Sequence, residues 1–270
     1  MPRTLLSQLL FTLMALLVST GATTCARTQS SRPESIAIPS DSTDLLNVII
    51  PTHIPSQTKD YEGFRLSFNA DNHTPNWVAW ELTDNETDGA NSRTNKFWLD
   101  TEIEGCPDTK DYTRSGYDRG HICPAADNKL TPQMMHDCFV MTNVCPQAHN
   151  LNAGAWKTLE TKERLWANKL KKIVIVAGPI YDSNDTQRIG NTGVRVPSAF
   201  YKVIIAPYSD TPMGIGFIYP NMSSPGNMFN YAMTIDQVEE ITGYDFFHNL
   251  PDDIENTIES TLNVKQWNKL

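Results

Sequence analysis

The longest helical pattern in the chain runs from Leu151 to about Lys172, between two segments that have the character of strands. Apolar residues recur within it at spacings of about four and seven, which gives the helix one apolar stripe for packing. Residues 173–181 follow directly as an apolar, β-prone run, which is typical of a buried strand. A long amphipathic helix joined to a buried strand predicts a domain that mixes helices with a sheet.

The remaining elements are predicted from the helical period of about 3.6 residues and the strand period of about two residues. Strand patterns occupy residues 45–50, 63–69, 77–82, 117–123, 139–144, 199–206 and 213–219. Helix patterns begin at Thr131-Pro132 and cover 234–242 and 251–262. Polar, turn-prone residues 70–76 predict a β-hairpin. Because no repeat or linker interrupts residues 44–270, we expect one α+β domain there.

Residues 83–116 form a long polar stretch rich in Gly, Asp, Asn and Thr. A loop of this length is either functional or poorly ordered. It contains Arg93 and Phe97.

The first 26 residues have the pattern of an export signal. Arg3 precedes an apolar run from Leu5 to Val18, and small residues follow. The run is too short to span a bilayer, so we expect no transmembrane segment in the mature chain. Residues 27–43 are rich in Ser, Thr and Pro and predict a flexible linker. The expected location is therefore periplasmic or extracellular, or at the cell surface if Cys25 carries a lipid anchor.

The chain has a formal net charge of −9, which excludes bulk attraction to a polyanion but permits a local basic cleft. Four cysteines remain after Cys25: Cys106, Cys123, Cys138 and Cys145. Export permits disulfides, so an even number predicts two bridges, and the pairing we favour is Cys123–Cys145 with Cys106–Cys138. Zinc held by these cysteines and nearby histidines is the alternative, although the spacings match no common zinc pattern.

Candidate chemical groups gather in two places. The first is Asp118-Arg119-Gly120-His121, where charged residues stand beside an imidazole that can accept a proton near neutral pH. The second is the helix from Leu151, where Asn152 offers an amide oxygen to a hard metal ion and Glu160 a carboxylate. The structural alternatives are a helix cap for Asn152 and a surface ion pair between Glu160 and Arg164.

The ordered set of these motifs resembles the DNA/RNA non-specific endonucleases, the sugar-non-specific branch of the ββα-metal (His-Me finger) nucleases. The similar segments are residues 118–121, 142–147 and 151–160, and further ones at 176–181, 196–197, 201–204 and 239–252. The resemblance covers roughly residues 44–265.

The resemblance implies a central antiparallel sheet flanked by helices, with two strands and a helix forming a ββα-metal finger. It implies Mg²⁺ as cofactor, with Mn²⁺ or another divalent ion as a substitute, and DNA and RNA as substrates contacted through backbone phosphate. It implies that His121 is the general base, that Asn152 is the metal ligand and that Glu160 holds metal-bound water. Arg119 and Arg93 would contact the phosphate. Asn143 and Arg164 would support the site. A non-catalytic nucleic-acid-binding protein on the same fold is the competing hypothesis.

Overall fold

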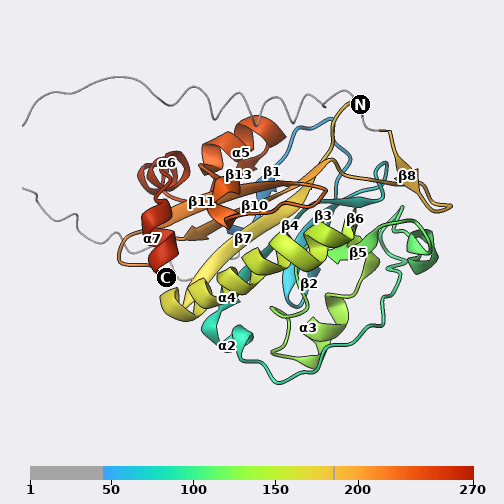
Figure 1. Cartoon of the computed structure of the whole chain (residues 1–270), viewed down its shortest axis with the longest axis horizontal. Coiled ribbons are helices and arrows are strands. Elements are labelled where there is room, and N and C mark those ends of the chain that lie inside the picture. Colours follow the sequence, from blue (N-terminus) through green and yellow to red (C-terminus); the bar gives the residue numbers. More distant parts are fainter. Residues whose placement is uncertain (1–44, 185) are drawn as a thin grey trace, which may run out of the picture. The chain divides into compact units, whose positions relative to one another are not determined.

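A seven-stranded antiparallel sheet forms the centre of the computed structural model, which describes residues 45–184 and 186–270 (Figure 1). Its strands, in spatial order, are β12 (Ala232–Met233), β11 (Met213–Pro220), β10 (Ala199–Ala206), β7 (Lys172–Ile180), β4 (Thr74–Thr83), β3 (Phe64–Asn69) and β2 (Gln57–Tyr61). The expected export signal, the linker and the anchor at Cys25 lie outside the described residues.

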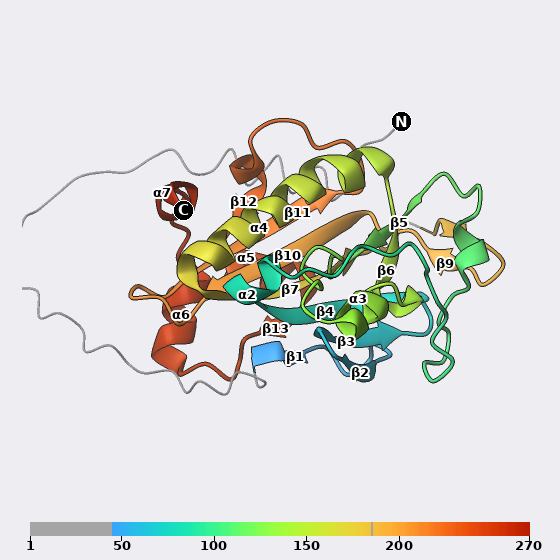
Figure 2. The same ribbon diagram turned by 90° about the horizontal axis from the view of Figure 1, so that it is seen from below.

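Helices cover both faces of this sheet (Figures 1 and 2). On β11, Phe217 stacks with Trp166 of α4 (Lys157–Leu170) at 6.5 Å between ring centroids. Gly216, its neighbour along the strand, would direct a Cβ at Val238 of α5 (Ile235–Thr242). Because successive residues of a strand point to opposite faces, α4 and α5 lie on opposite sides of the sheet. Coverage of both faces explains why β7 and β10 are apolar almost throughout.

The smaller elements surround this arrangement. They are β1 (Val48–Ile49) paired with β13 (Asp245–Phe246), β5 (Asp118–His121) paired with β6 (Val144–Gln147), β8 (Arg188–Ile189) paired with β9 (Val194–Arg195), and the helices α2 (Asp84–Thr87), α3 (Pro132–Asp137), α6 (Asp252–Ser260) and α7 (Val264–Lys269). Short 3-10 turns occupy η2 (Thr109–Tyr112), η3 (Met141–Asn143) and η5 (Met228–Tyr231). None of the helices found in residues 45–184 and 186–270 is long and apolar enough to span a bilayer.

The predicted α+β fold with a central antiparallel sheet is confirmed, and so is the hairpin of β3 and β4. Helix α5 begins after Thr234, whose side chain accepts a hydrogen bond from the Gln237 amide at 3.2 Å. The prediction missed β2, because its sequence QTKDY is mostly polar and carries little apolar alternation.

Two predicted elements have different bounds. The strand expected at 139–144 is wrong, since residues 141–143 form the 3-10 turn η3 and β6 begins only at Val144. The helix expected at 151–172 opens with a π-helical segment, η4 (Leu151–Trp156), before α4. Lys171 has a positive φ of 74°, which ends the helix, and Lys172 already belongs to β7.

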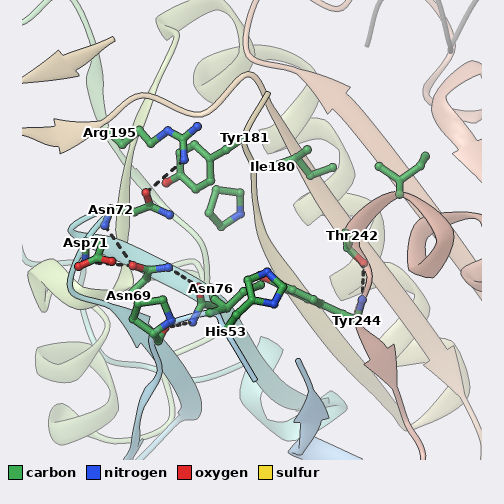
Figure 3. Close-up of a pocket in the computed structure, with 14 residues that line it drawn as sticks. His53, Asn69, Asp71, Asn72, Asn76, Ile180, Tyr181, Arg195, Thr242 and Tyr244 are labelled. Atoms are coloured by element: carbon green, nitrogen blue, oxygen red, sulfur yellow. Dashed lines mark hydrogen bonds between the residues drawn. The ribbon is translucent and has the colours of Figure 1, made fainter. Parts of the chain in front are cut away.

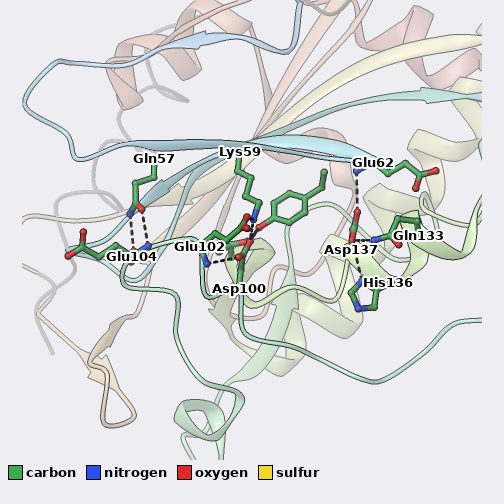
Figure 4. Close-up of polar contacts among 11 residues, drawn as sticks. Gln57, Lys59, Glu62, Asp100, Glu102, Glu104, Gln133, His136 and Asp137 are labelled. Carbon is green, nitrogen blue, oxygen red and sulfur yellow. Dashed lines mark hydrogen bonds and ion pairs between the residues drawn. The ribbon is translucent and has the colours of Figure 1, made fainter.

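The stretch 83–116 is held against strand β2 by side-chain contacts (Figure 4). Lys59 on β2 forms ion pairs with Asp100 at 2.6 Å and Glu102 at 2.8 Å. Gln57 exchanges two hydrogen bonds with the backbone of Glu104, each of 2.9 Å. These contacts join residues 100–104 of the stretch to β2, and nearer to Arg93 the Asn91 side chain donates to the Lys129 carbonyl at 2.8 Å.

Candidate active site

Strand β5 presents His121 beside β6, its antiparallel partner, with His121 opposite Val144. Asn143 fixes the backbone immediately after the histidine. Its fully buried side chain accepts a hydrogen bond from the Cys123 amide at 2.9 Å and donates to the Cys123 and Cys138 carbonyls, each at 2.9 Å. The structure therefore gives Asn143 a bracing position, and these bonds also favour the turn η3 over the predicted strand.

The His121 imidazole lies in an aromatic pocket and is 8% exposed. The ring centroids of Phe97 and Phe139 lie 5.1 Å and 4.8 Å from its own. Its Nε2 is buried and has no hydrogen-bond partner among the described residues. Burial, with a smaller contribution from the charge of Arg93, lowers the pKa of His121 from 6.5 to about 3. The imidazole is therefore neutral near pH 7.

Two guanidinium groups stand next to the same aromatic rings. Arg119 lies over Phe97 at 5.4 Å, and one of its Nη atoms donates to the Thr109 carbonyl at 2.8 Å. Arg93 lies over Phe139 at 5.2 Å and is exposed. Because each ring also contacts the imidazole, both arginines flank His121. Guanidinium groups in such a position can bind an anionic phosphate.

Asn152 is joined to β5 through its side chain. Its Nδ2 donates to Asp118 Oδ2 over 2.8 Å, and the ring of His149 contacts the same oxygen through Nδ1 at 2.9 Å. The Oδ1 of Asn152 has no partner among the residues that the structure describes. Asp118 thus fixes which end of the amide is free, and the free end is the oxygen.

Glu160 lies on α4 beside two buried ion pairs. Lys202 and Glu163 are both 0% exposed, and their Nζ and Oε2 atoms are 3.1 Å apart. Arg164 contacts the fully buried carboxylate of Asp127 at 2.9 Å rather than pairing with Glu160. The ion pair between Glu160 and Arg164, weighed from their spacing, is therefore absent.

The Glu160 carboxylate makes no hydrogen bond or ion pair within the described parts of the chain. Burial raises its pKa to about 8, while the positive charge of Lys202 acts in the opposite direction. A carboxylate placed in this way gains stability from any cation that reaches it.

Gly120 permits close contact inside the finger. A Cβ at this position would lie 2.4 Å from Oε1 and 2.5 Å from Cβ of Gln147, whose side chain is fully buried on β6. Any larger residue would push the two strands or the Gln147 side chain apart.

The three groups without protein partners fit a hard divalent cation and water. They are an amide oxygen on Asn152, a carboxylate on Glu160 and the Nε2 of His121. Oxygen donors suit Mg²⁺ and Mn²⁺. Buried polar atoms normally have partners, so the unpartnered Nε2 of His121 marks a place for a ligand. The donor chemistry of the site is thus compatible with the ion that the resemblance implies.

The expected disulfides are not formed, since Cys106, Cys123, Cys138 and Cys145 are free thiols. The antiparallel register places Cys145 opposite Gly120 rather than opposite Cys123. Burial raises the pKa of Cys106 and of Cys138 to about 12, which keeps these thiols protonated. The groups of potential metal ligands found in residues 45–184 and 186–270 include none of the four cysteines.

A separate pocket of about 360 Å³ lies between the β3–β4 turn and the end of α5 (Figure 3). Its lining contains none of the predicted site residues. Its polar groups largely bond to one another, as Asn69 does to Asn76 at 3.1 Å and Asn76 to the Pro55 carbonyl at 2.9 Å. The pocket therefore offers few free groups for chemistry.

Sequence reasoning did not assign roles to several residues that shape the site: Asp118, Lys202, Glu163, Asp127, Phe97 and Phe139. A signal existed for Lys202, which is a charged residue inside the apolar run Ala199–Ala206. Such a residue in a buried strand requires a buried partner. Phe97 was noted only as part of the loop that carries Arg93, and Phe139 only as the first residue of the strand predicted at 139–144.

A known protein family matches most of the chain. The sequence model of the family described as DNA/RNA non-specific endonuclease matches residues 41–253. A protein named nuclease from Nostoc sp. is 32% identical over 215 residues, covering 74% of this chain and 76% of the relative.

Relatives whose names include the word mitochondrial have the same level of sequence identity to this chain. Nuclease EXOG of Danio rerio is 32% identical, with 71% of this chain and 61% of the relative covered. The mitochondrial nuclease of Saccharomyces cerevisiae is also 32% identical, with 70% and 65% covered. The chain thus spans about three-fifths of the length of these longer relatives.

A solved structure has a similar fold. It is a crystal structure of the EndoG/EndoGI complex, with a TM-score of 0.66 and 27% identity, covering 72% of this chain and 86% of the other.

Proposed function

The chain belongs to the DNA/RNA non-specific endonuclease family, and we propose that it is an exported, Mg²⁺-dependent endonuclease that hydrolyses DNA and RNA with little sequence preference. The observation that carries this proposal is the neutral, buried His121, whose Nε2 is unpartnered and which two arginines flank. A general base needs a free nitrogen that can reach the attacking water, and the unpartnered Nε2 of His121 supplies that nitrogen.

His121 accepts a proton from the water that attacks phosphorus. Its neutral state needs no prior loss of a proton, and the rings of Phe97 and Phe139 restrict the orientation of the imidazole. The phosphorus–oxygen bond to the leaving group then breaks, the leaving oxygen takes a proton from solvent water, and the proton on Nε2 is released to solvent.

Arg119 and Arg93 hold the scissile phosphate. Guanidinium groups donate hydrogen bonds to phosphate oxygens and stabilise the negative charge that grows on them in the transition state. Arg119 is oriented before substrate arrives, because it rests on Phe97 and donates to the Thr109 carbonyl. Contacts of this kind are made to the backbone of nucleic acid, which explains the expected lack of sequence preference.

Asn152 and Glu160 would hold the divalent ion, Asn152 through its free amide oxygen and Glu160 through water. The ion would supply Lewis-acid stabilisation of the transferred phosphate and of the leaving oxygen. Asp118 keeps the amide in the required orientation by accepting the hydrogen bond from Nδ2.

The test is a cleavage assay on the purified chain from residue 27, with supercoiled plasmid and a folded RNA as substrates. We expect nicked and linear plasmid and fragmented RNA in Mg²⁺, and no products in EDTA. Products that appear equally in EDTA would refute the metal dependence. Binding of plasmid without any cleavage in Mg²⁺ or Mn²⁺ would favour the non-catalytic nucleic-acid-binding protein.

Export is supported by the composition of the first 26 residues. The relatives from Danio rerio and Saccharomyces cerevisiae are named mitochondrial. Mitochondrial transit peptides are rich in arginine, whereas residues 1–26 contain only Arg3 before an apolar run. Sequencing of the mature amino terminus decides the matter: we expect cleavage after Ala22 or Ala26, or lipid on Cys25, and an intact Met1 on the cell-associated protein would contradict export.

A further inference from the structure

Three carboxylates meet where helices α5 and α6 pack together, far along the chain from the finger. Asp236 and Glu239 lie one helical turn apart on α5, and Glu259 lies near the end of α6. One oxygen from each lies within 4.8 Å of the other two, which is close enough for one cation to contact all three.

Glu259 distinguishes this cluster from ordinary surface acids. Its side chain is 6% exposed, and its Oε1 is buried without a hydrogen-bond partner among the described residues. An ionised carboxylate in this position is stable only if a cation or donors surround it. The described ion pairs include none that involves Asp236, Glu239 or Glu259, so residues 45–184 and 186–270 supply no cation there.

The side chains next to this cluster are also acidic. Asp245 and Glu255 are near enough that they raise the pKa of both Glu239 and Glu259, after the larger effect of burial. One oxygen of Glu239 is already fixed, because Oε1 accepts a hydrogen bond from the Phe246 amide at 2.7 Å. That bond orients the carboxylate and leaves its second oxygen for a ligand.

We propose that Asp236, Glu239 and Glu259 bind a hard divalent cation, with Ca²⁺ as the best fit, at the junction of α5 and α6. The donors are all oxygens, and Ca²⁺ accepts irregular sets of carboxylates completed by water, whereas Mg²⁺ requires near-octahedral order. Asp236 is exposed, so the ion enters and exchanges from solvent. The bound ion ties α5 to α6 and stabilises the helices that cover this face of β11. This site is independent of the proposed nuclease activity.

The test measures ion binding in the Asn152→Ala variant, which removes the direct metal ligand of the proposed active site. Thermal melting and calorimetric titration with CaCl₂ are expected to show one ion per chain and a rise in Tm of about 2–5 °C at saturation. Addition of Glu259→Gln should abolish both signals. The same change should raise the Tm in EDTA, because it removes a buried ionisable group.

Asp236→Asn provides a second variant, since an exposed first-turn residue can be replaced without disturbing the core. It should weaken CaCl₂ binding by at least about tenfold, as expected for loss of one charged ligand. Asp253→Asn is the matched control on α6, because Asp253 is exposed and stands outside the cluster; binding should be unchanged. An absence of any CaCl₂ response in the Asn152→Ala background, or a full response in Glu259→Gln and Asp236→Asn, would overturn the proposal.

Discussion

Asn152 donates a hydrogen bond from Nδ2 to Asp118 Oδ2 over 2.8 Å, and this bond joins the helix of the finger to the strand that carries His121. The two residues are 34 positions apart in the sequence. The candidate base and the candidate metal ligand are thus connected through one carboxylate, whose removal should affect metal binding before it affects the fold.

Asp118→Ala should therefore weaken activity through the ion. Without its acceptor, the Asn152 amide can rotate and present its NH₂ group instead of its oxygen. We expect activity to fall by about 10–100-fold and the Mg²⁺ concentration for half-maximal cleavage to rise. A Mg²⁺ titration of plasmid cleavage measures both.

His149→Ala is the matched control, because His149 contacts the same Asp118 oxygen but is 73% exposed. It should leave the Mg²⁺ requirement unchanged. An Asp118→Ala variant with the wild-type Mg²⁺ response would show that the amide needs no such restraint.

The stability of the protein should depend on pH through His121. Its folded pKa of about 3 lies below the ordinary 6.5, so the unfolded chain binds a proton between these values and the folded chain does not. Stability is therefore lost on acidification below about pH 6.5, by up to about 1.4 kcal/mol per pH unit. Above that pH the histidine contributes no pH dependence.

His121→Gln removes this effect. The loss in free energy of unfolding between pH 7 and pH 5 should be smaller by roughly 2 kcal/mol than in the wild type, as urea unfolding at both pH values would show. Parallel pH dependences of wild type and variant would mean that His121 titrates normally in the folded protein.

Lys202→Met should destabilise the fold, because it leaves the Glu163 carboxylate buried and unpaired. Loss of one partner of such a pair costs about 3–5 kcal/mol, whereas replacement of both partners by apolar residues recovers much of that cost. The double variant Lys202→Met/Glu163→Leu should thus be more stable than Lys202→Met in urea unfolding.

Lys171→Met is the comparison at the surface. Its partner Asp84 lies 2.9 Å away, but Lys171 is 77% exposed, so the loss of stability should be much smaller than for Lys202→Met. Equal costs for Lys202→Met and Lys171→Met would contradict the importance of the buried pair.

Gly120→Ala should disturb the strand pair of the finger. The new methyl group would collide with the Gln147 side chain, and overpacking of this kind costs about 1–3 kcal/mol. Because β5 carries His121, the rate of plasmid cleavage should fall by a larger factor than the fraction of folded protein. Gly120→Ala/Gln147→Gly creates room and should regain part of both, and a single variant as active as the wild type would rule out the close contact as a requirement.

Most of the sheet was predictable because its residues lie in long, regular patterns. Strands β7 and β10 are apolar almost throughout, with Lys202 as the exception inside β10, and Phe64–Asn69 alternates. Edge strand β2 was missed because edge residues stay solvated and polar. The strand predicted at 139–144 was wrong because Asn143 bonds to Cys123, and a contact across 20 residues leaves no trace in local periodicity.

The site was predictable as a set of residue types, but its connections were not. The histidine, asparagine and glutamate could be named from their motifs. The pairing of Lys202 with Glu163, 39 residues away, depends on how β10 packs against α4. Local sequence patterns do not predict that packing. The same holds for the bond between Asp118 and Asn152.

The general-base role of His121 is tested most directly by the single-turnover rate of plasmid cleavage for His121→Ala and for the wild type, in Mg²⁺ at pH 7. The role predicts a fall of about 10²–10⁴-fold with substrate binding and melting temperature retained. A His121→Ala variant that folds and cleaves at the wild-type rate would contradict it.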